Sequence, residues 1–141
     1  MVRPWALNNL GGTLSAQHRY DEAIPMLTDA VRIFRQVGDR RREALAVNNL
    51  GRVFSGTGRL DEAITAHTEA AEMFRQTGDR HGEATAWHAL GLARHAAGRP
   101  DEAAVAIGKA AVGYQEAGDR HWYQRALALL DQIKAQERDG T

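Results

Sequence analysis

Residues 40–79 decide the architecture of this chain: RRREALAVNNLGRVFSGTGRLDEAITAHTEAAEMFRQTGD. Residues 80–119 are identical to this stretch at 16 of 40 aligned positions, without a gap. The preceding residues follow the same pattern, because the Asn-Asn-Leu-Gly of 48–51 also stands at 8–11. Self-similarity at a fixed period indicates a structure made of stacked copies of one unit. The 141 residues therefore form a single domain of three repeats and a final segment, with the boundaries 1–39, 40–79, 80–119 and 120–138.

Within a repeat, apolar residues recur at a spacing of three and four, which is typical of amphipathic helices. In 43–54 they fall at Ala44, Val47, Leu50, Val53 and Phe54. No stretch alternates strictly between apolar and polar residues, so we predict no strand. The pattern predicts an all-α protein of seven helices, over residues 3–16, 21–37, 40–56, 61–77, 80–97, 101–117 and 120–137.

The residues between the helices are those that end and start helices. Gly78 stands where a helix C-terminus needs a positive φ, and Asp79 follows as the N-cap of the next helix. The same Gly-Asp pair recurs 40 residues earlier and later. We expect Asp61 and Asp101 to be the N-caps of the second helix in their repeats. Each repeat is therefore predicted to be a helical hairpin.

A glycine stands in the middle of the first helix of every repeat, at positions 11, 51 and 91. Glycine in a helix interior costs about 1 kcal/mol relative to alanine. A cost that recurs in register indicates that the two helices of each hairpin approach closely there. We expect the partners across the contact to be the alanines at positions 23, 63 and 103, and we expect the alanines at 30, 70 and 110 to pack between successive hairpins.

These positions resemble the signature of tetratricopeptide (TPR) repeats. In the second repeat the signature falls on Val47, Leu50, Gly51, Phe54, Ala63, His67 and Ala70. The departures are Arg94 and His67 at usually apolar positions and a repeat of 40 residues rather than about 34. The length resembles the kinesin-light-chain-like and GPR/GoLoco-adaptor subtypes, and the arrays of actinobacterial SARP-type and NB-ARC regulators. The resemblance implies an α-solenoid, which residues 120–138 would close as a capping helix.

The resemblance also implies where a ligand binds, because TPR ligands usually lie in the groove lined by the first helix of each hairpin. Carried over by position, that inner face consists of Asn8, Asn9, Ser15, Asn48, Asn49, Arg52, Ser55, His88, Leu92, His95, Arg125 and Gln132.

Asn9 and Asn49 are the most informative of these residues. Asparagine is disfavoured in mid-helix because its amide competes for backbone hydrogen bonds. One amide can donate to and accept from the main chain of an extended peptide, and the resemblance implies that role here. The alternative is that Asn8 or Asn48 faces water or caps a neighbouring turn. Ala89 interrupts the series, so we expect the third repeat to recognise side chains.

His81, His88 and His95 lie seven residues apart and so share one helix face. We expect no metal site, because residues i and i+7 are about 10 Å apart along a helix, too far to ligate one ion. The alternatives are a groove face that gains charge below about pH 6.5 and, for His81, solvated surface. His67 is expected to be a partly buried packing histidine.

The composition excludes several functions. The chain has 18 basic and 18 acidic residues, which does not suit a broad contact with nucleic acid. No apolar run approaches the roughly 18 residues of a membrane span. There is no cysteine, and no nucleophile, base and acid are spaced as a catalytic motif. We therefore expect no direct nucleic-acid or membrane partner, no cofactor, no catalytic residue and no enzymatic activity.

We predict a cytoplasmic module that binds a partner peptide or helix in its concave groove. A polar or acidic segment is favoured, because the groove face carries Arg52, Arg125 and histidines with few carboxylates. The resemblance implies that it could be the C-terminal sensor or scaffold part of a bacterial transcriptional regulator. The alternative is self-association into a homodimer through the first hairpin, where no preceding repeat covers Trp5 and Leu7.

Overall fold

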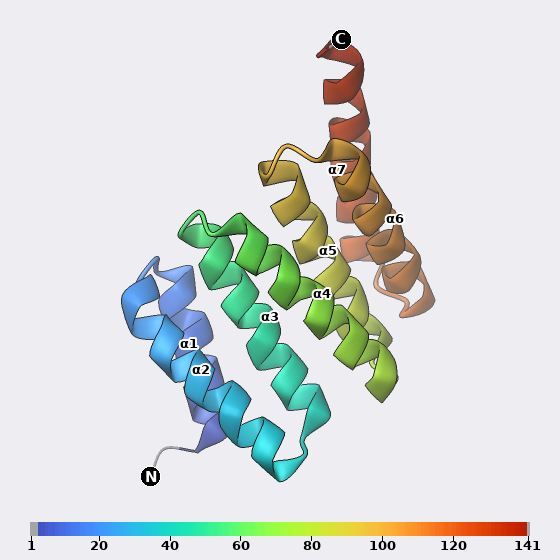
Figure 1. Cartoon of the computed structure of the whole chain (residues 1–141). Coiled ribbons are helices and arrows are strands. Elements are labelled where there is room, and N and C mark those ends of the chain that lie inside the picture. The colour runs from blue at the N-terminus through green and yellow to red at the C-terminus, as the bar shows by residue number, and fades with distance from the viewer. Residues whose placement is uncertain (1–2, 141) are drawn as a thin grey trace.

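The computed structural model describes residues 3–140, which form seven α-helices and no strand. The helices are α1 (Pro4–Ala16), α2 (Tyr20–Val37), α3 (Arg40–Gly56), α4 (Leu60–Thr77), α5 (Arg80–Ala96), α6 (Pro100–Glu116) and α7 (Arg120–Asp139). Each helix packs against the next one along the chain, so that α1/α2, α3/α4 and α5/α6 are hairpins. The hairpins stack in chain order, and the N- and C-termini lie at opposite ends of the stack (Figure 1). The predicted all-α solenoid is confirmed.

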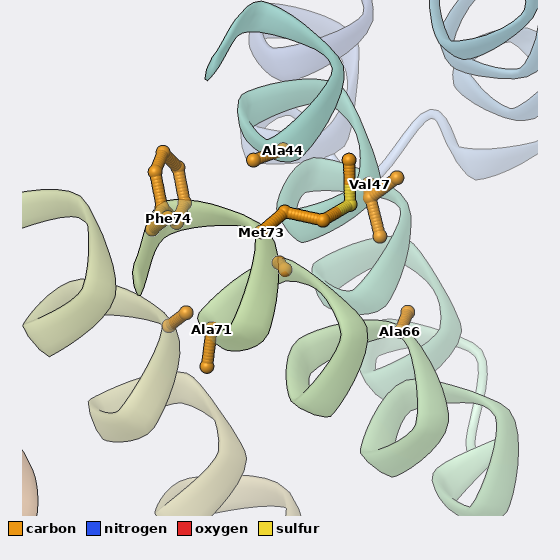
Figure 2. Packing of buried hydrophobic residues seen from close by; sticks show 8 residues of the cluster. Ala44, Val47, Ala66, Ala71, Met73 and Phe74 are labelled. Carbon is orange, nitrogen blue, oxygen red and sulfur yellow. The ribbon is translucent and has the colours of Figure 1, made fainter. Parts of the chain in front are cut away.

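The hairpins pack through small residues that let the helices come close. Ala44 and Val47 of α3 face Met73 and Phe74 of α4 in one buried cluster, in which Met73 extends toward Val47 (Figure 2). Ala71, on the other side of α4, belongs to the same cluster. Burying a side chain the size of Met or Phe stabilises the fold by about 2 kcal/mol. The alanines at 30, 70 and 110 are fully buried, as the sequence predicts.

Turns between hairpins are built as expected. Gly78 has φ 75°, and Asp79 accepts a hydrogen bond from the Gly82 backbone N–H at 2.8 Å. The prediction that Asp61 and Asp101 are N-caps is wrong, because the helices begin one residue before each of them and the N-caps are arginines. Both carboxylates stand in the first turn instead, where the helix dipole favours negative charge.

The helix-interior glycines do mark the closest approach within each hairpin, but the partner differs from the prediction. A Cβ atom added to Gly51 would lie 2.5 Å from Cε1 of His67. The same contact is made by Leu27 in the first hairpin and by Ile107 in the third. The partner is therefore the residue one helical turn after the predicted alanine. Ala63 is fully buried but is not among the atoms nearest to Gly51, whereas in the third hairpin the carbonyl oxygen of the predicted Ala103 lies 3.2 Å from a Cβ added to Gly91.

None of the helices within residues 3–140 combines the length and the hydrophobicity that a membrane crossing would need.

Candidate functional site

The odd-numbered helices form one face of the stack. Helix α3 contacts both α1 and α5, whereas the even-numbered helices pack against their neighbours in the chain. Two hollows open along this face. One, of about 410 Å³, lies over α1 and α3. The other, of about 550 Å³, lies between α3, α5 and α7 with Tyr114 of α6 at its wall. Arg52 lines both hollows, so they form a continuous surface that we call the inner groove.

The hollow over α1 and α3 is lined by amides, hydroxyls and small residues. Nδ2 of Asn49 donates a hydrogen bond to Oδ1 of Asn8 across the two repeats, at 2.9 Å. Asn9 is exposed beside this pair, and Ser15 lines the same hollow. The sequence analysis did not predict this bond between Asn8 and Asn49. This bond fixes the orientation of one amide and leaves the other donor and acceptor of Asn49 for a ligand.

Asn48 does not lie in the inner groove, contrary to the prediction. Its side chain is 5% exposed, and its Oδ1 lies 2.7 Å from Nδ1 of His67. His67 is itself 1% exposed. Burial, with a smaller effect of the Arg52 charge, lowers the pKa of His67 to about 4, so its imidazole is neutral at pH 7. The neutral ring donates from Nδ1 to the Asn48 carbonyl oxygen, and that buried bond takes Asn48 away from the groove.

The second hollow, which we call the aromatic hollow, is built around Tyr114 and Trp122. Their rings stack with centroids 6.1 Å apart and an interplanar angle of 26°. His88 meets both rings edge-on, at 6.0 and 5.8 Å. The guanidinium of Arg125 lies over the Trp122 ring, 5.0 Å from its centroid. Leu92 and Ser55 complete the lining among the predicted groove residues.

The aromatic hollow arises from one departure from the repeat. Phe74 and Tyr114 occupy equivalent positions, and the residues that face them 8 positions later are Gly82 and Trp122. A Cβ atom added to Gly82 would lie 2.5 Å from the Phe74 ring, so α5 approaches α4 closely there. Trp122 instead stacks on Tyr114, and α7 packs chiefly against α6. An aromatic pair between α6 and α7 thus stands where the preceding repeat has a phenylalanine against a glycine.

The inner groove has an unbalanced charge. No Asp or Glu lines either of its hollows, whereas Glu72 and Glu69 each line a hollow on the opposite, outer face. Arg52 and Arg125 have no carboxylate partner within the described residues 3–140. Burial, and then the charges of Arg125 and Arg52, lower the pKa of His88. The inner groove is therefore positively charged at neutral pH.

Two of the predicted groove residues, His95 and Gln132, lie outside both hollows. His95 is half-buried, and its Nδ1 has no hydrogen-bond partner. Gln132 is exposed on α7, beyond the aromatic hollow. His81 does line the aromatic hollow and bonds Oδ2 of Asp119 at 2.9 Å. In the part of the chain that the structure describes, no three potential metal ligands gather in one place.

The sequence analysis missed Tyr114 and Trp122 as groove residues. Tyr114 donates a weak hydrogen bond to Thr85 Oγ1 at 3.4 Å, and burial raises the pKa of its phenol. The signal that could have found them is the replacement of Gly82 by Trp122 at equivalent positions of the period. Helical periodicity alone assigns Trp122 to the apolar stripe of the capping helix.

Comparisons with known proteins agree with this geometry. A family model described as tetratricopeptide repeat matches residues 2–76 and, in an overlapping second match, residues 42–116. The chain belongs to the tetratricopeptide repeat family. TPR repeats generally mediate interactions between proteins, and the family is typically a non-enzymatic scaffold.

Solved structures resemble this TPR chain over nearly its whole length. BtubC (BKLC) from P. vanneervenii superposes with a TM-score of 0.69 at 18% identity, covering 96% of this chain and 64% of that one. The nearly identical TPR-like repeats of a protein designated a kinesin light chain from Podosopora anserina give 0.67 at 18% identity, covering 98% and 78%. At this identity the likeness shows the fold. No curated protein matches the TPR chain by sequence.

Proposed function

We propose that this protein binds an extended, polar or acidic segment of a partner protein along its inner groove. The observation that carries the proposal is the charge of that face. Both hollows of the groove lack carboxylates, and Arg52 and Arg125 stand there without ion-pair partners among residues 3–140. A positive surface steers and holds a segment of opposite charge. Two hollows on the outer face contain Glu side chains, and in a third Arg32 and Arg35 are each paired with a carboxylate, so the outer face does not share this property.

The amides over α1 and α3 supply the second part of the recognition. Asn9 is exposed and Asn49 is held in place by Asn8, so both can bond the main chain of an extended segment. Main-chain bonds give affinity with little sequence selection, and the aromatic hollow then selects side chains. The groove thus combines a general holding surface with a selective one.

The test uses peptides selected on the protein from a random peptide library. We expect the selected peptides to be enriched in Asp and Glu and to shift NMR signals of the inner groove. Asn9→Ala together with Asn49→Ala should weaken their binding by roughly tenfold while leaving the melting temperature within about 2 °C, because two surface amides contribute little to the core. Thr68→Ala on the outer face is the matched control. Unchanged affinity in the double variant would reject the groove mechanism.

The proposal also covers the cellular location of the protein and the larger protein in which it acts. A cytoplasmic location and a place as the sensor or scaffold part of a bacterial transcriptional regulator are supported by the resemblance of the long repeat. The coding sequence on either side of residues 1–141 tests this, since a DNA-binding or NB-ARC domain encoded in the same frame would support it.

A second candidate function is self-association through the first hairpin. Trp5 and Leu10 are 52% and 45% exposed on α1, at one end of the stack formed by residues 3–140. The predicted Leu7 does not contribute, since it packs against Ala30 and Phe34. Light scattering over a range of concentrations tests this function, and a mass that stays at that of one chain excludes it. Trp5→Ser with Leu10→Ser should abolish any dimer found.

A further inference from the structure

Arg19, Arg59 and Arg99 recur at a 40-residue step, and each pairs with the glutamate three residues later. Arg52 and Arg125 do not recur at these steps, because glycine or leucine stands at the positions equivalent to Arg52 and leucine or threonine at two of those equivalent to Arg125. They also have no carboxylate partner within residues 3–140. The repeated arginines stabilise the scaffold, whereas these two are specific to the aromatic hollow.

The aromatic hollow joins this charge to an apolar wall. Leu92 is 48% exposed and Trp122 is 38% exposed, and both line it. A bare anion would leave this wall in contact with water, while an apolar group alone would leave the arginines unpaired. The lining therefore fits a carboxylate with an aliphatic group next to it. Through Arg52 the hollow continues into the amide-lined part of the groove, which suits a chain that runs on in that direction.

His88 stands at the centre of this site. From α3 it is faced by the charge of Arg52, and from α7 by Arg125 and the ring of Trp122. The ring of Tyr114 faces His88 from α6. His81, two turns earlier on the same helix as His88, contacts the same ring. No carboxylate lines the aromatic hollow, and Asp119 bonds His81 and accepts from the Trp122 backbone N–H. The Nδ1 atom of His88 is buried and has no hydrogen-bond partner.

We propose that the aromatic hollow binds an Asp or Glu side chain of the partner segment with an adjacent aliphatic side chain against Leu92 and Trp122, and that His88 takes up a proton when this carboxylate binds. The inference rests on the proposed function, since it places one part of the partner segment. Burial and then the charges of Arg125 and Arg52 disfavour the charged form of His88, and the bound carboxylate neutralises the two arginines. Binding of the carboxylate therefore raises the pKa of His88, and by linkage a lower pH tightens binding.

The side-chain source of the carboxylate follows from the continuity of the groove. A segment held by its main chain at Asn9 and Asn49 passes Arg52 before it reaches the aromatic hollow. It can place an internal Asp or Glu there without ending. A chain terminus would supply the same carboxylate, and the experiment distinguishes the two sources.

The probes are three capped compounds: acetyl-Glu-Leu-amide, its neutral isostere acetyl-Gln-Leu-amide, and acetyl-leucine, which has a terminal carboxylate. Binding is followed by NMR at the Trp122 indole N–H and the His88 imidazole. We expect acetyl-Glu-Leu-amide to shift both signals saturably and to bind about tenfold more tightly than the neutral isostere, since a charge-assisted hydrogen bond is lost in the latter. Tighter binding of acetyl-leucine than of acetyl-Glu-Leu-amide would overturn the side-chain assignment.

Matched variants test the residues. Arg125→Gln should weaken binding of acetyl-Glu-Leu-amide by about tenfold, whereas Arg120→Gln, which removes the same charge from the same helix outside the hollow, should not. Binding should tighten from about pH 8 to about pH 5.5 in the parent. In His88→Asn, which installs the residue found at positions 8 and 48, the remaining affinity should no longer depend on pH over this range. His121→Asn should retain the pH dependence. A pH dependence that survives His88→Asn would overturn the proton uptake.

The outcome separates this inference from the proposed function. If acetyl-Glu-Leu-amide leaves Trp122 unshifted while the library peptides still require Asn9 and Asn49, the aromatic hollow is not the carboxylate site and the groove function stands. If the library peptides bind away from the inner groove, the proposed function itself fails.

Discussion

The hairpins α3/α4 and α5/α6 have the same glycine at their closest approach but face it with different side chains. In α5/α6 the partner of Gly91 is Ile107, which needs no hydrogen bond. In α3/α4 the partner of Gly51 is His67, a buried imidazole that needs one. Burying such a group without a partner costs about 1–3 kcal/mol, and Asn48 supplies the bond from the helix opposite.

This difference decides which residues reach the inner groove. Asn48 turns inward and bonds His67. His88, at the equivalent position of the third repeat, stays at the aromatic hollow because Ile107 needs no hydrogen-bond partner. In the first repeat Leu27 fills the contact, and Asn8 is free to bond Asn49. One core position in each hairpin thus determines whether the polar side chain at the neighbouring position reaches the groove. The following experiments test that relation.

The largest effect is expected from closing the glycine contact itself. Gly91→Leu should lower the free energy of unfolding by about 3 kcal/mol, because the new Cβ would lie 2.3 Å from Cδ1 of Ile107. Urea denaturation measures the change. Gly108→Ala is the control, since a Cβ there meets nothing within 4 Å, and it should stabilise α6 by up to about 1 kcal/mol. A Gly91→Leu variant that melts like the parent would disprove the close approach.

Lowering the pH should affect the stability of the two hairpins differently. His67 is neutral in the fold down to about pH 4, but in the unfolded chain it binds a proton below about 6.5. The unfolded state therefore holds more protons in this window, and the free energy of unfolding falls as the pH drops, by up to about 3 kcal/mol from this residue. His67→Leu, which copies Leu27, should remove this part of the pH dependence in urea denaturation at a series of pH values. His121→Gln, an exposed histidine, should leave it in place.

A transplant makes the third hairpin resemble the second. Ile107→His should cost about 2 kcal/mol, because it buries an imidazole with no partner. Adding His88→Asn should recover about 1 kcal/mol of this, since the new amide can accept from the new imidazole as Asn48 does from His67. A double-mutant cycle by chemical denaturation measures the coupling. Strictly additive effects would show that the pairing in the second hairpin does not explain the position of Asn48.

The smallest effect compares two equivalent asparagines. Asn48→Ala should destabilise the protein by about 1.5 kcal/mol, because it leaves the buried Nδ1–H of His67 unpaired. Asn8→Ala removes a bond between partly exposed amides and should cost only about 0.5 kcal/mol. Thermal unfolding of the two variants side by side checks the ratio. Equal losses would mean that both asparagines serve the same purpose.

Much of this could be predicted from the sequence. The 40-residue period, the helices, the Gly-Asp turns and the buried alanines follow from local propensity and periodic burial, which a single repeat already contains. The sequence also pointed to Arg52, Arg125 and His88 as groove residues, and the structure places all three at the aromatic hollow. The period states which positions are equivalent, and on a regular solenoid equivalent positions occupy equivalent places.

Only the tertiary structure decided how equivalent positions differ. Whether Asn48 faces the groove or the core depends on a hydrogen bond to His67, 19 residues away and on another helix. The aromatic hollow depends on Tyr114 of α6 stacking with Trp122 of α7 where the preceding repeat has a phenylalanine and a glycine. These differences depend on contacts between side chains of different helices, so the residue pattern within one helix does not predict them. The sequence determined the repeating scaffold, and contacts between helices determined the chemistry of its inner groove.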